Sequence, residues 1–202
     1  MKIIEDKRAP NPRRVRVFLA EKGIEMTYEQ LDINEGDHKT DAFTALNPMQ
    51  RIPVLVLDDG TAISETISIC RYFEAVQPDP PLFGTTALEK ATIDMWLRRC
   101  EEKLMMPIAA VLRHGNPRMA HLEVPQVPEW AEANRPKVEC MLDVLDAELA
   151  TRDYIAGDAY SAADITALTG IDFMRIIKMS IGERPSLQGW HDRVSARPSA
   201  AA

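Results

Sequence analysis

The segment RIPVLVLDDGTAIS, residues 51–64, is the feature that most restricts the fold of this chain. An apolar run is followed by Asp59-Gly60 and a second β-prone run, which is the pattern of a β-hairpin. Pro53 stands at the start of the first strand, where a residue without an N–H group is tolerated. A cis Ile52–Pro53 bond would expose the backbone of Val54 to an extended ligand, whereas a trans proline at a strand edge is the commoner case.

Strand and helix patterns alternate on both sides of this hairpin. The expected order is strand 2–5, helix 12–22, strand 27–33, helix 42–48, hairpin 52–64 and helix 65–75. This order, β-α-β-α-β-β-α, predicts a mixed sheet in which a parallel crossover is joined to an antiparallel edge hairpin.

The start of the first helix, in APNPRRVRVFLAEKG (9–23), is built like an anion-binding site without a reactive side chain. Asn11 suits the N-cap, Pro12 suits the first helical position, and Gly23 suits the residue that ends the helix. Ala9 carries no hydroxyl, and no cysteine precedes Cys70. The pattern therefore predicts a loop that holds an anion through the helix amino terminus and an amide side chain.

A proline-rich segment, VQPDPPLFG (76–84), divides the chain, because only helical patterns follow it. We expect an α/β domain over residues 1–76, a linker over 77–86 and an all-helical domain over 87–202. Helical patterns cover 88–112, 138–149, 160–168 and 185–198. In YSAADITAL (160–168), Ser161 and Asp164 have the spacing of a capping box.

The charge balance excludes some classes of partner. Lysine and arginine number 24 against 31 aspartates and glutamates, a net charge of −7, and no basic block occurs. We therefore expect no nucleic acid and no anionic membrane as partners. The amino terminus has no signal-like apolar region, and the three cysteines show no metal-ligand spacing, so we expect a cytoplasmic protein with reduced thiols and no metal.

SETIS (64–68) places Glu65 and Thr66 where the hairpin meets the next helix. A hydroxyl and free helix amides can hold a carboxylate there, while Glu65 can receive an ammonium group. The alternative is a plain capping pair without a ligand.

Five segments in this order resemble the cytosolic glutathione transferases, with the pattern of bacterial theta- and delta-like members: NPRRVRVFLAEKGI, GDHKTDAFTALNPMQRIPVL, ISETISICRYF, YSAADITAL and W…RVSARPS. The resemblance implies a thioredoxin-like domain followed by an all-α domain. It implies that Val54, after a cis proline, pairs its backbone with the cysteinyl part of glutathione, and that Asp164 is structural. The residues implied to contact glutathione are Asn11, His38, Gln50, Ile52, Pro53, Val54, Glu65 and Thr66.

The same resemblance leaves Asn11 as the residue next to the glutathione sulfur. Serine-type members carry their hydroxyl six residues before the valine of RVR, which is Ala9 here, while nu-class members have TPN where this chain has APN. Lowering a thiol pKa by about 2 units requires about 2.7 kcal/mol. A hydrogen bond to the thiolate supplies about 1.5–3 kcal/mol, and a helix amino terminus adds about 0.3–1 kcal/mol. Asn11 and its helix therefore suffice without a hydroxyl.

The expected function is addition of glutathione to small hydrophobic electrophiles, which would bind near Trp96, Met105 and Met106. Core packing is the alternative for these three side chains. Two other functions stay open: reduction of disulfides or peroxides by the same thiolate, and a non-catalytic adaptor that keeps the fold. The resemblance also implies a homodimer.

Overall fold

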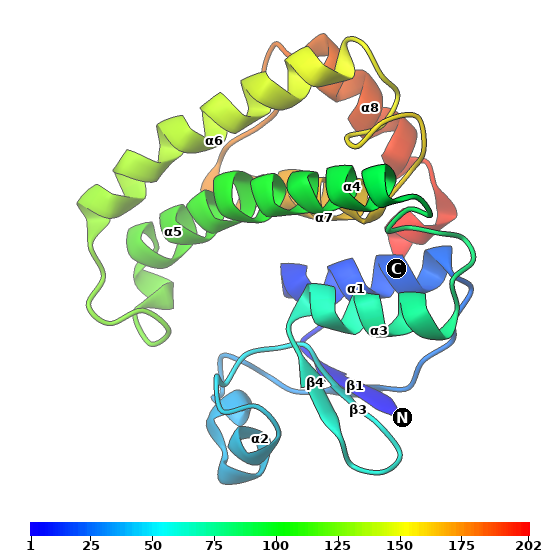
Figure 1. The fold of residues 1–202 in the computed structure, drawn as a ribbon. Coiled ribbons are helices and arrows are strands. Elements are labelled where there is room, and N and C mark those ends of the chain that lie inside the picture. Colours follow the sequence, from blue (N-terminus) through cyan, green and yellow to red (C-terminus); the bar gives the residue numbers. More distant parts are fainter. The chain divides into compact units, whose positions relative to one another are not determined.

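The computed structural model describes residues 1–202 and contains two compact units. The first unit comprises residues 1–82 together with 198–202, and the second comprises residues 83–197. The first is a thioredoxin-like α/β unit and the second is all-helical (Figure 1), so the predicted fold class is confirmed.

Four short strands form one mixed sheet in the order β2-β1-β3-β4. Their bounds are β1 Lys2–Glu5, β2 Tyr28–Gln30, β3 Val54–Val56 and β4 Ala62–Ser64. β2 is parallel to β1, whereas β3 is antiparallel to both β1 and β4. Consequently β1 and β4 end at the same edge of the sheet, and β3 begins there.

Helices cover both faces of this sheet. α1 (Pro10–Glu21) and α3 (Thr66–Val76) lie side by side on one face (Figure 1). α2 (Asp41–Leu46) packs on the other, where Phe43 contacts a cluster that includes Ile4 and Val54. Since α1 follows β1 and α3 follows β4, the amino termini of both helices lie at the edge where β3 begins.

Lys22, at the end of α1, fastens the start of the linker to the α/β unit. Its side chain is fully buried, and its Nζ lies 2.6 Å from the carboxylate of Glu74. The same ammonium group donates to the carbonyl oxygens of Gln77 and Pro80, both at 2.8 Å. A buried ammonium group is tolerated because its charge is paired and its protons are hydrogen-bonded.

The second unit consists of α4 (Ala87–Cys100), α5 (Met106–Gly115), α6 (Pro128–Leu149), α7 (Ala162–Phe173) and α8 (Pro185–Ser195). The single helix expected over 88–112 is wrong in one respect, because a π-helical turn, Glu101–Met105, separates α4 from α5. Leu104 in this turn packs against α7 at Gly170, where an added Cβ would lie 3.1 Å from Leu104 Cδ2. The π turn therefore coincides with a close approach of two helices.

Asp164 organises the start of α7 from inside the second unit. The predicted capping box is present: Oδ2 accepts the Ser161 backbone N–H and hydroxyl, both at 3.0 Å. Oδ1 accepts the Ile155 N–H at 2.9 Å and the Trp190 indole N–H at 2.8 Å. Burial raises the pKa of Asp164, and these hydrogen bonds oppose the rise. One carboxylate thus joins α7 to α8 and to the preceding loop.

Residues 198–202 pack against α1 and so belong to the first unit rather than to the helical one, where we expected them. The Arg13 guanidinium donates to the carbonyl oxygen of Ala200 at 3.1 Å. The buried Ser199 hydroxyl donates to the carboxylate of Glu21. The α/β unit is therefore built from two stretches of chain that are distant in sequence.

Replacing Gly84 with alanine is expected to lower the free energy of unfolding by about 3 kcal/mol. Gly84 has φ +80°, and an added Cβ would lie 2.6 Å from the Cβ of Glu89 in α4. Gly182→Ala is the control, because Gly182 has φ +67° but its nearest added contact, Arg184 Nη1 at 3.4 Å, is at an ordinary van der Waals distance. It should cost only about 1 kcal/mol. Urea unfolding followed by tryptophan fluorescence tests this, and equal losses would exclude the steric clash.

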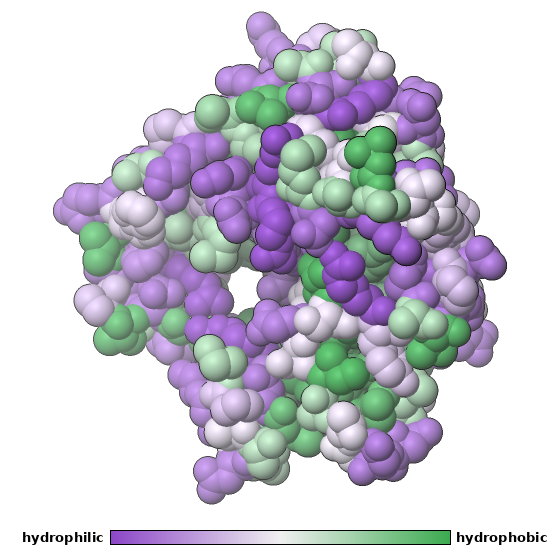
Figure 2. All heavy atoms as spheres, viewed as in Figure 1, coloured by the Kyte–Doolittle hydropathy of each residue, from purple (hydrophilic) through white to green (hydrophobic).

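The face drawn in Figure 2 is mostly hydrophilic, and its apolar side chains form small separate groups. None of the helices has the length and hydrophobicity needed to cross a bilayer. The apolar residues are concentrated instead inside the two units, with Val15, Phe18 and Leu55 in the first and Leu97, Leu142 and Leu168 in the second.

Candidate functional site

Three chain segments with unsatisfied polar groups meet at the edge of the sheet where β3 begins. The register pairs Val54 with Ile4 on one side and with Ser64 on the other. Neighbouring strands lie about 4.8 Å apart. Ile4, Val54 and Ser64 thus form one row across the sheet. Just outside this row, at the same edge of the unit, lie Pro53, Glu65 and the start of α1.

The amino terminus of α1 offers a single open backbone donor. The N-cap is Ala9, and its side chain makes no capping hydrogen bond, so the predicted N-cap at Asn11 is wrong by two residues. The reason is that Pro10 already occupies the first helical position that Pro12 was expected to fill. Of the N–H groups at the start of α1, that of Ala9 donates to the Asp6 carbonyl oxygen, and Pro10 and Pro12 have none. Only the Asn11 N–H is therefore open to a ligand.

The side chain of Asn11 is exposed and is oriented by a buried arginine. Asn11 Oδ1 accepts from Arg14 Nη1 at 3.3 Å, and Arg14 is only 4% exposed. The amide NH₂ group of Asn11 makes no hydrogen bond within the chain. With its oxygen held by a guanidinium, the exposed amide keeps its NH₂ donors available to a ligand. Arg14 is thus a buried guanidinium in α1 that contacts the Asn11 side chain.

The Ile52–Pro53 peptide bond is cis. Val54, however, lies inside β3 between two paired strands, so the expected free backbone at Val54 is absent. The backbone N–H and C=O of Ile52, immediately before the cis bond, make no hydrogen bond within the chain. The groups able to pair with an extended ligand therefore belong to Ile52, and the β-ladder excludes Val54 from that role.

The amino terminus of α3 is also uncapped. Glu65 is its N-cap, is exposed, has φ +69°, and makes no capping hydrogen bond. The backbone N–H groups of Thr66, Ile67 and Ser68 donate to no group in the chain. A non-glycine residue with positive φ costs of order 1–3 kcal/mol, and such strain is concentrated at ligand sites. This end of α3 can therefore hold an anionic group, with a carboxylate beside it.

Gln50 and His38 lie in the segment that leads to the cis bond, but they differ in exposure. Gln50 has φ +53°, and its amide donates to the Thr44 hydroxyl at 2.9 Å. His38 is only 3% exposed, in a short 3-10 turn after Gly36. Gln50 is half-buried beside the site, whereas the His38 imidazole lies inside the unit.

Sequence reasoning missed a pair of residues in the loop between β1 and α1. Asp6 Oδ1 accepts from Arg8 Nε at 2.8 Å, and Asp6 Oδ2 accepts from Arg8 Nη2 at 2.6 Å. The hydrogen bond from Arg8 lowers the pKa of Asp6, so Asp6 stays a carboxylate at neutral pH. The spacing of an aspartate and an arginine two residues apart, directly after a strand, is the only signal for this pair in the sequence.

The three residues expected near the electrophile differ in exposure. Trp96 is 1% exposed, and the guanidinium carbons of Arg99 and Arg152 lie 4.6 and 4.9 Å from its ring centre. Met105 is half-buried in the π turn, and Met106 is 65% exposed. Only the two methionines therefore present side-chain surface that a small molecule could contact.

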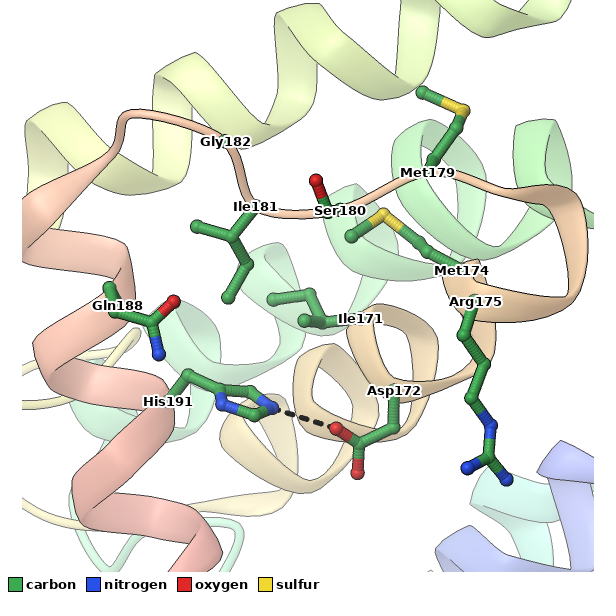
Figure 3. Close-up of a pocket in the computed structure, with 10 residues that line it drawn as sticks. All are labelled: Ile171, Asp172, Met174, Arg175, Met179, Ser180, Ile181, Gly182, Gln188 and His191. Carbon is green, nitrogen blue, oxygen red and sulfur yellow. Dashed lines mark hydrogen bonds and ion pairs between the residues drawn. The ribbon is translucent and has the colours of Figure 1, made fainter.

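A separate pocket of about 490 Å³ lies wholly inside the helical unit (Figure 3). Ile171, Met174 and Ile181 point into it, and His191 Nε2 lies 2.7 Å from Asp172 Oδ1 at its side. The Ser180 hydroxyl points away from the His191 imidazole (Figure 3), so Ser180 and His191 do not form a nucleophile–base pair. No predicted glutathione-site residue lines this pocket, and no group of His, Cys, Asp and Glu in the chain is arranged to hold a metal.

Comparison with known families matches both units of the chain. Residues 9–76 match the model described as "Glutathione S-transferase, N-terminal domain", and residues 104–198 match "Glutathione S-transferase, C-terminal domain". Among curated relatives, "Glutathione S-transferase 2" of Saccharomyces cerevisiae is 37% identical over 203 residues, covering 98% of this chain and 87% of the relative.

Solved structures show the same similarity over the full length. Gtt2 from Saccharomyces cerevisiae superposes with a TM-score of 0.95 at 36% identity, covering 100% of this chain and 99% of that chain. A glutathione S-transferase domain-containing protein from Marinobacter aquaeolei VT8 also gives 0.95 at 37% identity, covering 98% and 99%. Both units of the chain therefore have relatives of known fold.

Proposed function

Because the chain belongs to the glutathione S-transferase family, we propose that it binds glutathione at the edge of the sheet where β3 begins and activates the thiol for transfer. The observation that carries this proposal is the meeting of three unsatisfied elements at one edge of the α/β unit: the amino terminus of α1, the backbone of Ile52 and the amino terminus of α3.

Each element matches one part of an extended tripeptide. The open amides of α3 and the Thr66 hydroxyl suit the carboxylate of the γ-glutamyl residue, and Glu65 suits its ammonium group. The free N–H and C=O of Ile52 suit the cysteinyl backbone, as in strand addition. The sulfur would then lie at α1, while Gln50 would face the glycyl end.

The chemistry follows from the donors at α1. The glutathione thiol gives its proton to solvent, and the thiolate is held by the N–H and amide NH₂ groups of Asn11, whose side-chain oxygen contacts Arg14. The sulfur then forms a bond to an electrophilic carbon, and the leaving group departs with the electron pair of the bond that breaks. The protein supplies binding, orientation and a lowered thiol pKa, and no protein side chain is the nucleophile.

A second function, reduction of mixed disulfides, uses the same thiolate. It is favoured by the exposed Asn11 and by a loop with no hydroxyl or thiol of its own, so the glutathione sulfur is the only nucleophile there. The thiolate would attack one sulfur of the disulfide, and the other sulfur would leave as a thiolate. Turnover of an activated aryl halide against a mixed disulfide separates the two reactions.

The site assignment predicts that Glu65→Gln and Thr66→Ala each weaken glutathione binding about tenfold or more, since each removes a charge-assisted hydrogen bond. Isothermal titration calorimetry with glutathione measures the dissociation constants. Glu25→Gln is the matched control, because Glu25 is also exposed and lies beyond the opposite end of α1. It should leave the affinity unchanged.

Two results would contradict the proposal. Unchanged affinity in both Glu65→Gln and Thr66→Ala would reject the assignment of the α3 amino terminus. Tight binding in the unmodified protein with no turnover of either substrate would favour the non-catalytic adaptor, for which the missing hydroxyl at Ala9 is the main argument.

A further inference from the structure

The first turn of α1, which carries the Asn11 donors, has no capping side chain to fix its backbone position. Its N-cap, Ala9, has no side chain able to hold the first turn. Two of its first three residues are prolines, which cannot donate. Arg14 orients the Asn11 amide from within α1, but the position of the first turn itself depends on the loop that enters the helix, residues 6–9.

That loop is closed by two independent contacts. The Ala9 N–H donates to the Asp6 carbonyl oxygen at 3.0 Å, which closes the backbone turn. The Arg8 guanidinium forms two parallel hydrogen bonds to the Asp6 carboxylate, and the Arg8 N–H adds a third at 3.0 Å. The Asp6 side chain is only 3% exposed, whereas the Arg8 side chain is 54% exposed, so the guanidinium covers a buried carboxylate from the solvent side.

Arg8 also connects the loop to a second segment. Its Nη2 donates to Asp32 Oδ1 at 2.6 Å, and the Asp32 N–H donates to the Asp37 carboxylate at 2.8 Å. Asp37 directly precedes His38 in the 3-10 turn. One guanidinium therefore ties the entry of α1 to residues 32–37, and it neutralises one of the two carboxylates that it contacts.

We propose that Arg8 is a positioning residue, whose fork on Asp6 holds the first turn of α1 where Asn11 donates to the glutathione sulfur. The proposal rests on the proposed function and deepens it. Arg8 does not touch the substrate. Its loss would let the Asn11 donors move and would leave Asp6 and Asp32 as two uncompensated negative charges near a thiolate, and both effects raise the thiol pKa.

The planar fork distinguishes arginine from lysine at this position. Lysine keeps the positive charge but cannot form two parallel hydrogen bonds to one carboxylate while reaching a second one. Arg8→Lys therefore removes the positioning and keeps the charge, whereas Arg8→Gln removes both. The ordered series arginine, lysine, glutamine separates geometry from electrostatics.

The test compares two quantities in each variant: the dissociation constant of glutathione by calorimetry, and the pKa of the bound thiol by ultraviolet titration of the thiolate band. We expect Arg8→Lys to leave the dissociation constant within about threefold, while the thiolate fraction below the thiol pKa falls about tenfold. Arg8→Gln should lower the thiolate fraction further. The control is Arg98→Lys, because Arg98 forms an exposed ion pair with Glu101 at 2.6 Å in the helical unit.

The outcomes separate this proposal from the one on which it rests. A lowered thiol pKa in the unmodified protein that Arg8→Lys does not change would overturn the role of Arg8 alone. Arg8→Lys with a lower Tm and weaker binding but the same thiol pKa would make Arg8 merely structural, which also overturns it. A bound thiol with its free pKa in the unmodified protein would overturn both proposals.

Discussion

Asp164→Ala is expected to lower the free energy of unfolding of the helical unit by at least about 4 kcal/mol, which is about a thousandfold in the folding equilibrium. The carboxylate accepts four hydrogen bonds, from Ile155 N–H, from the Ser161 N–H and hydroxyl, and from the Trp190 indole. Alanine would leave these donors buried without acceptors, and each costs about 1–3 kcal/mol. Losses of this size arise from few mechanisms, and an orphaned hydrogen-bond network is one.

The measurement is urea unfolding followed by tryptophan fluorescence. All three tryptophans, Trp96, Trp130 and Trp190, lie in the helical unit, so the signal reports on that unit. Asp164→Asn should cost roughly half as much, because its one oxygen can still accept the Ile155 and Trp190 donors. Asp158→Ala, an exposed aspartate in the preceding loop, should change the unfolding free energy by less than about 0.5 kcal/mol. Equal effects of Asp164→Ala and Asp158→Ala would refute the role of the network.

Asn11→Ala is expected to raise the pKa of the bound glutathione thiol by about 1 to 2 units, which is a tenfold to hundredfold loss of thiolate at pH values below that pKa. The substitution removes the amide NH₂ donor and keeps the backbone N–H of the first turn. Ultraviolet difference titration of bound glutathione measures the shift directly. The pH profile of kcat/KM with an activated aryl halide should move by the same amount.

Asn11→Asp is the control that separates catalysis from helix stability. A carboxylate in the first turn stabilises a helix through its dipole, so α1 should not weaken. The same carboxylate repels a thiolate and cannot donate to it, so the thiol pKa should rise beyond the value in Asn11→Ala. If Asn11→Ala left the thiol pKa unchanged, the backbone N–H and Arg14 would have to stabilise the thiolate without the amide.

Local patterns predicted the element order, because each pattern depends on residues close in sequence. The Asp59-Gly60 hairpin and the Ser161–Asp164 capping box are both present, and both are decided by a few neighbouring side chains. The expected start of α1 is wrong because Pro10 and Pro12 both suit the first helical position, and only the backbone geometry at Ala9 distinguishes them.

The features that sequence could not predict depend on contacts between distant residues. Which of Ile52 and Val54 keeps a free backbone follows from the pairing of β3 with β1 and β4. The fork of Arg8 on Asp6 extends to Asp32 only because β2 lies beside β1. The burial of Arg14 likewise follows from the packing around α1, and no periodicity distinguishes it from a solvated arginine.

The packing of residues 198–202 on α1 has a consequence for co-translational folding. Translation delivers residues 1–82 early, but the segment that covers α1 is made only after the entire helical unit. In a nascent α/β unit, the part of α1 that residues 198–202 cover therefore stays exposed while residues 83–197, more than half of the chain, are synthesised. The order of translation thereby delays completion of the α/β unit until after the helical unit has been made.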